Sequence, residues 1–346
     1  MAFFRRELLA IDLGTSNTRV YTKQKGLVIS EPTLIVKTGE RNGKKVGGED
    51  AMNLLGRTND EGTVIHPVKN SRICDLENAT AIVSYFVDKA IGPSRVLSAR
   101  CYMTVPKRMT AQDKSTVNSV IAKSGMKLKA STHVPSVIAT ALGAKLHVLD
   151  KDGSMIVSIG GGSTEVAVLS LGGIVEYRSV PSGGDRMNED IVAYINREFN
   201  VNISEKAAEN LKIDLGSALP YREEDNRRQF LRGRDVVSNL PQTIEVTASM
   251  IYEALKPACN EILQGIRYVL ERIPPELAGD LLRDGIVLAG GGALMCGMEK
   301  FISEELGIKV RIAADPLNST VEGLGMLVRD PSLAGKLKLT TDADAV

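Results

Sequence analysis

The chain has 346 residues, of which 43% are hydrophobic and 25% are charged, a composition typical of a globular protein with two domains. Basic residues number 43 against 42 acidic ones, and tryptophan is absent, so neither a general polyanion binder nor a base-stacking platform is expected. No apolar stretch approaches the about 18 residues of a membrane-spanning helix, and four isolated cysteines favour reduced thiols in a cytoplasmic protein.

Predicted strands and helices alternate through the first half of the chain. An apolar run over residues 8–13 ends at a polar turn over 14–17, and a returning strand follows over 19–22. Thr110 and Asp113 resemble a capping box that opens a helix. The other elements expected before residue 150 are strands over 26–30, 33–37 and 99–105 and helices over 78–92 and 136–145.

The opening pattern returns 146 positions later in the sequence. A strand over 155–159 runs into a turn over 160–164, and a second strand resumes over 166–169. In this gapless alignment the apolar and the polar positions both coincide, and Asp12 falls opposite Ser158. Two strand–turn–strand units in one register predict two related halves. The alternative is a chance similarity between two glycine-containing hairpins.

The second half continues with the same alternation of elements. Ser204 is expected to cap a helix that carries Glu209 and Lys212. The charges over 222–235 alternate in sign, which favours a solvated strand or loop over a nucleic-acid patch. The remaining predicted elements are strands over 173–180, 285–289 and 309–312 and helices over 185–200, 247–272 (with Pro257 inside), 301–306 and 318–328.

Three glycine-rich turns each follow an apolar strand, at residues 14–17, 160–164 and 290–293. Glycine lets backbone amides approach an anion, and successive amides form anion-binding concavities. Asp12, at the end of a buried strand beside the first turn, suits a Mg²⁺ ion held through water. None of the turns has a P-loop or dinucleotide fingerprint. Together they predict a nucleotide cleft between the two halves.

The chain resembles bacterial actins of the MreB family, within the superfamily of actins, heat-shock chaperones and sugar kinases. The resemblance runs from about residue 8 to residue 328. It is carried by residues 11–18 (IDLGTSNT), 30–32, 160–168 (GGGSTEVAV), 170–173, 183–185, 232–235 (RGRD), 274–278, 285–294 (GIVLAGGGAL) and 315–317.

The resemblance implies an α/β actin-like fold. Its two duplicated domains have ribonuclease-H-like cores, each with a small subdomain, around an ATP–Mg²⁺ cleft. It also implies paired protofilaments of this chain, membrane association and a role in cell shape. The expected subdomains are IA (residues 1–30, 74–144 and 317–346), IB (31–73), IIA (145–181 and 247–316) and IIB (182–246).

The family's nucleotide-binding positions carry over onto this sequence residue by residue. Glu209 and Lys212 match the pair that contacts the nucleoside, although without the resemblance an exposed ion pair on a helix would be the better interpretation. Asp12 matches the residue that organises Mg²⁺. The other implied nucleotide-binding residues are Gly14, Thr15, Ser16, Asn17, Gly160, Gly161, Gly162, Ser163, Gly184, Asp185, Gly291, Gly292, Ala293, Leu294 and Met295.

Two departures from the family pattern predict weak or absent ATP hydrolysis. Ser158 stands where the family has a second metal-organising Asp, and Ser136 stands where it has the Glu that positions the attacking water. Loss of a general base costs about 10²–10⁴ in rate, so nucleotide binding is expected to outlast turnover. Thr164 remains a candidate for positioning the water, and Glu165 is the obvious acid that could substitute.

The expected location is the cytoplasm, at the inner face of the cell membrane if the amino-terminal segment binds lipid. Residues 2–6 (AFFRR) combine two rings with two arginines, and the alternative is a frayed terminus. The loop over 91–97 is shorter than the family's apolar loop. Paralogous filaments are further expected partners, and nucleic acid is not. The competing functions are a small-molecule kinase and a chaperone-type ATPase of the same superfamily.

Overall fold

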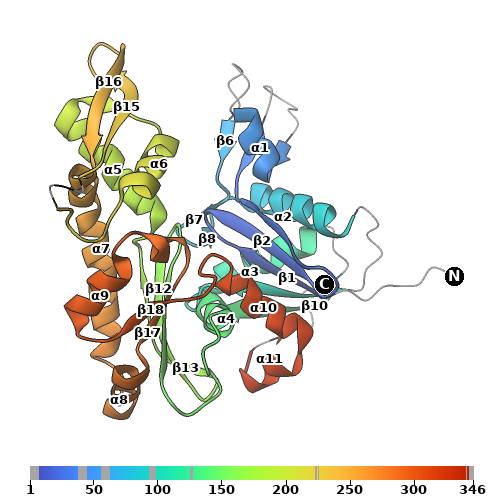
Figure 1. Ribbon diagram of the computed structural model, residues 1–346. Coiled ribbons are helices and arrows are strands. Elements are labelled where there is room, and N and C mark those ends of the chain that lie inside the picture. The colour runs from blue at the N-terminus through green and yellow to red at the C-terminus, as the bar shows by residue number, and fades with distance from the viewer. Residues whose placement is uncertain are drawn as a thin grey trace. The chain divides into compact units, whose positions relative to one another are not determined.

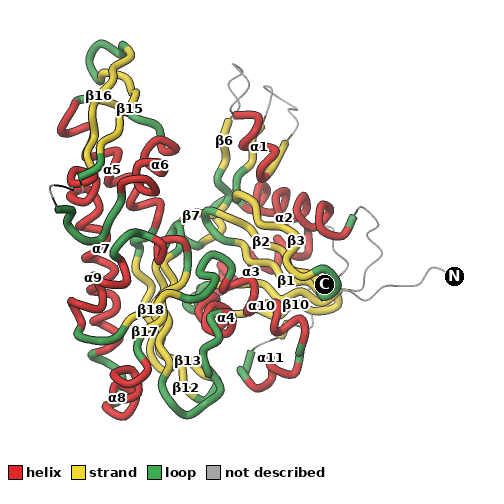
Figure 2. Tube along the Cα trace, in the orientation of Figure 1, coloured by secondary structure: helices red, strands yellow, loops and turns green. Residues whose placement is uncertain are grey.

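The computed structural model describes residues 8–37, 45–55, 63–92, 99–124, 128–222, 224, 226–339 and 341–342. The chain forms two compact units, whose helices and strands can be followed in Figures 1 and 2. Unit 1 comprises Met1–Lys151, Leu169–Ile174 and Asn318–Val346, and unit 2 comprises Asp152–Val168 and Val175–Leu317. The finer division into four subdomains stays a prediction.

Unit 1 is built on a six-stranded sheet. Its order is β19 (Thr341–Asp342), β10 (Leu128–Pro135), β9 (Ala99–Val105), β1 (Leu8–Leu13), β2 (Asn17–Thr22) and β3 (Gly26–Pro32). Strands β1, β9 and β10 are parallel, so their carboxyl ends lie at the same edge of the sheet. Asp12, near the end of β1, and Ser136, directly after β10, therefore belong to one edge.

Helices cover both faces of this sheet. Leu9, Ile11 and Val20 pack in one apolar core with α2 (Leu76–Ile91) and α3 (Ala111–Lys123). The alternate residues of β1 and β2 face α10 (Ser319–Arg329), which also packs along α4 (Ser136–Gly143). This alternation of faces explains why the apolar run of β1 is continuous, because both faces of the strand are covered.

Local capping residues set where the helices of unit 1 begin. The predicted capping box is confirmed, since the Thr110 hydroxyl accepts a hydrogen bond from the Asp113 amide and the Asp113 carboxylate accepts one from the Thr110 amide. Helix α2 begins two residues before the predicted Asn78, because the Asp75 carboxylate caps it by accepting the Asn78 amide hydrogen.

A smaller group of elements in unit 1 follows β3 in the chain. It consists of β4 (Ile35–Lys37), β5 (Lys45–Gly47) and β6 (Thr63–Ile65) in one sheet with α1 (Gly48–Leu55), and the pair β7 (Val68–Lys69) and β8 (Arg72–Ile73). The strands predicted over 26–30 and 33–37 are present, but the first extends to Pro32 and the second begins only at Ile35.

The main sheet of unit 2 repeats the strand order of unit 1. Its order is β13 (Gly173–Val180), β12 (Thr164–Ser170), β11 (Ser154–Ile159), β17 (Ile286–Ala289) and β18 (Val310–Ile312). This matches β3-β2-β1-β9-β10, with parallel neighbours β11, β17 and β18. Strand β11 covers the positions 146 residues after those of β1. The predicted duplication is therefore confirmed, and chance similarity of two hairpins is excluded.

Helices α5 to α9 and a three-stranded sheet complete unit 2. The elements are α5 (Gly184–Phe199), β14 (Val201–Asn202), α6 (Glu205–Leu215), β15 (Arg228–Asp235), β16 (Pro241–Thr247), α7 (Ala248–Leu270), α8 (Pro275–Asp284), the 3₁₀ helix η2 (Gly291–Leu294) and α9 (Met298–Leu306). The predicted cap Ser204 is confirmed, and Thr247, predicted as the start of a helix, caps α7, which continues through Pro257. A short helix, α11 (Ser332–Lys336), follows α10 in unit 1.

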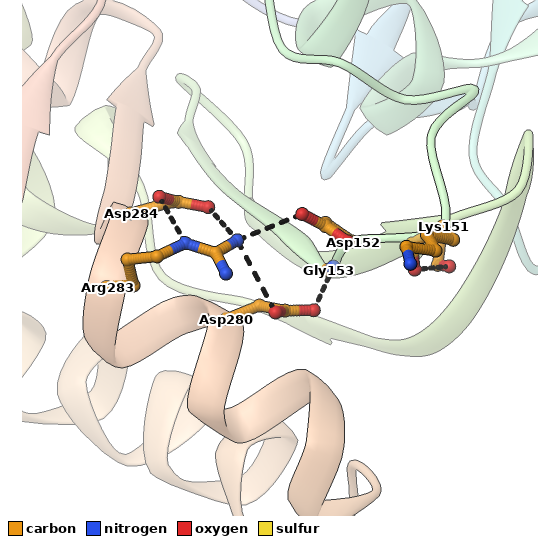
Figure 3. A network of polar contacts seen from close by, with 7 residues as sticks. Lys151, Asp152, Gly153, Asp280, Arg283 and Asp284 are labelled. Atoms are coloured by element: carbon orange, nitrogen blue, oxygen red, sulfur yellow. Dashed lines mark hydrogen bonds and ion pairs between the residues drawn. The ribbon is translucent and has the colours of Figure 1, made fainter.

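An ion network fixes the start of β11 to helix α8 (Figure 3). The Arg283 guanidinium lies 3.0 Å from the Asp152 carboxylate and 2.8 Å from that of Asp284. The Asp280 carboxylate, 3.4 Å from Arg283, accepts a hydrogen bond from the Gly153 amide at 2.7 Å. The hydrogen bonds from Arg283 lower the pKa of Asp284. The network holds the strand that leads into the second glycine-rich turn.

Among the described residues, no helix is both long enough and apolar enough to cross a lipid bilayer.

Candidate functional site

The second glycine-rich turn is closed by its own backbone. After β11, the Gly160 amide donates to the Ser163 carbonyl oxygen at 3.0 Å. A Cβ atom on Gly160 would lie 3.1 Å from that same oxygen, so a larger residue would push the turn open. The turn is thus a compact loop of successive small residues directly at the end of a buried strand, as the sequence predicts.

The first turn of helix α5 is fitted against this loop. The amides of Gly184 and Asp185 donate to the carbonyl oxygens of Gly160 and Gly161, each at 2.9 Å. A Cβ atom on Gly183 would lie 2.5 Å from the Gly161 oxygen, too close for any side chain. The positive end of a 16-residue helix therefore lies beside the second turn, where it favours a bound anion.

Helix α6 brings the predicted pair Glu209 and Lys212 to the same place. The Lys212 ammonium donates to the Gly184 carbonyl oxygen at 3.0 Å and to the Glu209 carboxylate at 2.6 Å. Asn188 of α5 donates to the same carboxylate at 2.7 Å. Only 12% of the Lys212 side chain is exposed. The pair is therefore not an isolated surface ion pair but part of the junction between α5, α6 and the turn.

The third glycine-rich turn packs on the end of β11. Gly290 has a positive φ of 81° and a Cβ atom on it would lie 2.3 Å from the Ile159 carbonyl oxygen, while one on Gly292 would lie 2.2 Å from the Ile159 side chain. The turn itself forms η2, a 3₁₀ helix that precedes α9. Ala293 is buried, whereas 55% of Leu294 is exposed.

The residues directly after η2 contact helix α7 and the segment that follows α6. The Met295 sulfur lies 4.0 Å from the Cys259 sulfur of α7, and Cys296 accepts a hydrogen bond from the Ala218 amide just after α6. The second turn, the first turn of α5 and the Glu209–Lys212 pair thus contact one another within unit 2, and the third turn packs on Ile159 at the end of β11. The small residues of the second turn and the adjoining helix terminus suit an anion.

Unit 1 carries the first glycine-rich turn with the same closure as the second. The Gly14 amide donates to the Asn17 carbonyl oxygen at 3.1 Å, and a Cβ atom on Gly14 would lie 2.7 Å from it. The Thr15 hydroxyl accepts a hydrogen bond from the Ser71 amide, and the Ser16 carbonyl oxygen accepts one from the Thr33 amide. These bonds fix the turn to the strands that follow it.

Asp12 is buried and is held by neighbours on both sides. The Thr104 hydroxyl donates to its Oδ1 at 2.8 Å, and the Arg19 guanidinium lies 3.8 Å from its Oδ2. Burial raises the pKa of the Asp12 carboxyl above its ordinary value, and the Arg19 charge and the Thr104 hydrogen bond act in the opposite direction. Arg19 was not predicted, although the hairpin pairs it directly with Asp12.

Three of the residues expected to bear on hydrolysis carry only hydroxyl groups, and two of these hydroxyls donate hydrogen bonds to backbone carbonyl oxygens. The Ser136 hydroxyl, at the first position of α4, donates to the Val105 carbonyl oxygen at 3.4 Å. Ser158 lies near the end of β11 beside Ala289 of β17. Thr164 is fully buried, and its hydroxyl donates to the Ser182 carbonyl oxygen at 2.6 Å.

Glu165, the acid that could substitute for the missing base, is buried. Its carboxylate accepts a hydrogen bond of 2.6 Å from the Tyr177 hydroxyl. In the described part of the chain, no three His, Cys, Asp or Glu residues come together as a metal site. With Asp12 paired to Arg19 and Ser158 opposite it in the repeat, the donor set does not fit a Mg²⁺ ion held by protein ligands.

Comparison with known proteins identifies relatives along almost the entire chain. The family described as MreB/Mbl protein matches residues 6–335. The cell shape-determining protein Mbl of Bacillus subtilis is 35% identical over 340 residues, which cover 97% of this chain and 100% of Mbl. The cell shape-determining protein MreB of Escherichia coli is 37% identical, with 92% of each chain covered.

Solved structures show the same similarity in three dimensions. The crystal structure of MreB5 of Spiroplasma citri bound to ADP superposes with a TM-score of 0.86 at 30% identity, covering 95% of this chain and 98% of MreB5. The crystal structure of the same protein bound to AMPPNP gives a TM-score of 0.87 at 29% identity, with 96% and 98% covered. The expected α/β actin-like fold is confirmed.

Proposed function

Because this chain belongs to the MreB/Mbl family of bacterial actins, we propose that it is a nucleotide-binding cytoskeletal protein that polymerises and acts in cell shape. The family match, the actin-like fold and the duplicated sheets support this proposal. Actin-like subunits join head to tail, and a heterologous contact that does not close generates a filament. The kinase and chaperone alternatives are not favoured, because the matched relatives are cell shape-determining proteins.

The observation that carries nucleotide binding is the junction in unit 2. The amino-terminal end of helix α5 lies beside the second turn, and the Lys212 ammonium contacts the Gly184 carbonyl oxygen in the first turn of that helix. MreB5, which shares 29–30% identity with this chain, was crystallised with ADP and with AMPPNP. We therefore assign ATP and ADP as ligands. The share of unit 1 in the site, through Gly14 to Asn17 and Asp12, stays a prediction.

Hydrolysis of the bound ATP is proposed to be slow. Phosphoryl transfer requires an oriented water and charge stabilisation around the transferred group. Ser136 offers a hydroxyl where a carboxylate base is needed, and Ser158 offers one where a metal-organising acid is expected. The Thr164 proton and the Glu165 carboxylate are already engaged by Ser182 and Tyr177. Such a subunit stays in the ATP-bound form for longer than one that retains both acids.

We also propose two partners for this protein, the membrane surface and paralogous chains. Residues 2–6 would insert two rings into an anionic membrane surface, and paralogous chains would share the filament. The amino-terminal segment and most of the loop over 91–97 lie outside the described residues. Membrane binding is tested by co-sedimentation with vesicles that contain anionic lipid, in which the full chain is compared with a variant that carries Phe3→Ser and Phe4→Ser.

Sedimentation combined with electron microscopy tests the proposed assembly. Filaments should pellet above a critical concentration when AMPPNP is present, because this analogue keeps the subunit in its triphosphate form. The Gly161→Val variant, whose side chain would obstruct a phosphate at the second turn, serves as the matched control and should require a higher concentration. A chain that stays monomeric at tens of micromolar over a range of salt and nucleotide conditions would overturn the proposal.

A further inference from the structure

The hairpin that carries the first glycine-rich turn places two opposite charges side by side. Strands β1 and β2 pair Asp12 directly with Arg19, and β9 supplies Thr104 on the other side of Asp12. Both oxygens of the Asp12 carboxylate thus have a neighbour from the chain, at 2.8 Å from the Thr104 hydroxyl and 3.8 Å from the Arg19 guanidinium. The charge of Asp12 is compensated within unit 1 itself.

The Arg19 guanidinium is buried but poorly satisfied. Only 13% of its side chain is exposed, and its one ion pair is longer than a hydrogen bond. Its Nε atom is buried and has no hydrogen-bond partner among the described residues. A buried guanidinium normally uses its five donors, and an unmade bond to a charged group is costly. An additional anion would satisfy the donors that Asp12 leaves open.

The position of Arg19 next to the first glycine-rich turn indicates that this anion is a phosphate group. Arg19 follows Asn17, the last residue of the first turn, by two positions, and Asp12 precedes Gly14 by two. The two charges therefore flank the turn whose small residues suit a phosphate group. In the repeat, the equivalents of Asp12 and Arg19 are Ser158 and Glu165, so this pair of charges occurs in unit 1 and not in its counterpart.

A divalent cation does not fit beside this pair. A guanidinium keeps its proton at any ordinary pH, so its positive charge would repel a Mg²⁺ ion bound at Asp12. The family's second metal-organising acid is also missing, because Ser158 stands at its position. The chain has thus lost one metal-organising carboxylate and neutralised the other.

We propose that Arg19 binds a phosphate group of the nucleotide and supplies there the positive charge that makes binding largely independent of Mg²⁺. This inference rests on the proposed nucleotide-binding function and adds a residue to it. Asp12 then acts as the positioning residue that holds the guanidinium beside the turn. An arginine suits this task because its planar donors can contact a carboxylate and a phosphate at the same time.

The test is calorimetric titration with ADP in excess Mg²⁺ and again in EDTA. The wild-type dissociation constant should differ by less than about threefold between the two conditions. Arg19→Met removes the charge at similar length, so in EDTA it should bind about tenfold or more weakly, as expected for a lost charge-assisted hydrogen bond. Mg²⁺ should restore most of that loss, because the freed Asp12 can then attract the ion.

Two further variants complete the experiment. Lys23→Met removes an exposed positive charge just after β2 and should bind ADP like the wild type in both conditions. Arg19→Met alone leaves the buried Asp12 charge without a partner and could prevent folding. The double variant Asp12→Asn/Arg19→Met removes both charges and avoids this problem. Its affinity for ADP in EDTA should also be about tenfold lower than that of the wild type.

Different results identify which proposal fails. If Arg19→Met binds ADP as tightly as the wild type in EDTA, or loses the same factor with and without Mg²⁺, the role of Arg19 is refuted. A wild-type affinity that depends strongly on Mg²⁺ also refutes it. If the wild type binds no ADP in either condition, the proposed nucleotide-binding function itself is wrong.

Discussion

Helices α4 and α10 cross at two glycines, and this crossing allows a sharp test of the packing in unit 1. A Cβ atom on Gly323 would lie 1.8 Å from the Ala139 carbonyl oxygen and 2.9 Å from the Gly143 amide nitrogen. A Cβ atom on Gly143 would lie 1.7 Å from the Ser319 carbonyl oxygen. All of these neighbours are backbone atoms, so no side-chain rotation can relieve the overlap.

Gly323→Ala should therefore force the two helices apart by about 1.5 Å, the amount needed to restore an ordinary contact. Overpacking costs about 1–3 kcal/mol, and loss of the 2.9 Å hydrogen bond between Thr140 and Thr320 adds about 1 kcal/mol. A destabilisation of about 2–4 kcal/mol lowers the melting temperature of a unit of this size by about 5–15 °C. Because α4 begins at Ser136, the change also moves this site residue.

Thermal unfolding followed by circular dichroism measures this effect. Gly335→Ala in α11 is the matched control, since no atom lies within 4 Å of a Cβ atom there, and its melting temperature should equal or slightly exceed that of the wild type. A melting temperature of Gly323→Ala within about 2 °C of the wild type, which corresponds to less than about 1 kcal/mol, would refute the close helix crossing.

In the second turn, Gly161→Val should abolish nucleotide binding, and calorimetry that still detects wild-type affinity would show that phosphates do not approach this residue. Ser136→Glu should raise steady-state phosphate release, because it supplies a carboxylate where the chain offers only a hydroxyl as the base. A wild-type rate equal to that of ordinary relatives would contradict this interpretation. The cap of α2 should depend on pH, because hydrogen bonds from Asn78 lower the pKa of Asp75. Its contribution is present above the unfolded-state pKa of about 3.9 and disappears as the pH falls through the lower folded-state value. Asp75→Asn cannot titrate, so melting temperatures measured from pH 6 to pH 2 should fall less steeply for this variant.

The repeated framework of the protein was predictable from the sequence, because it depends on local patterns. An apolar run followed by Gly14 or by Gly160 specifies a buried strand and a tight turn wherever it occurs. The helix starts at Thr110, Ser204 and Thr247 follow from side chains that bond amides three residues away. Even here Asp75 was missed, since its cap shifts the start of α2 by two residues.

Contacts between distant segments were decided by the tertiary structure alone. The family resemblance implied that Lys212 contacts a nucleotide, whereas the residues alone favoured an exposed ion pair, and only the packing of α6 on α5 places its ammonium on the Gly184 carbonyl oxygen. The sequence predicted Asp12 as a metal residue, and only the strand register shows Arg19 beside it. Local patterns fix φ, ψ and the period of a segment, whereas the partner of a buried charge depends on which strands and helices pack together.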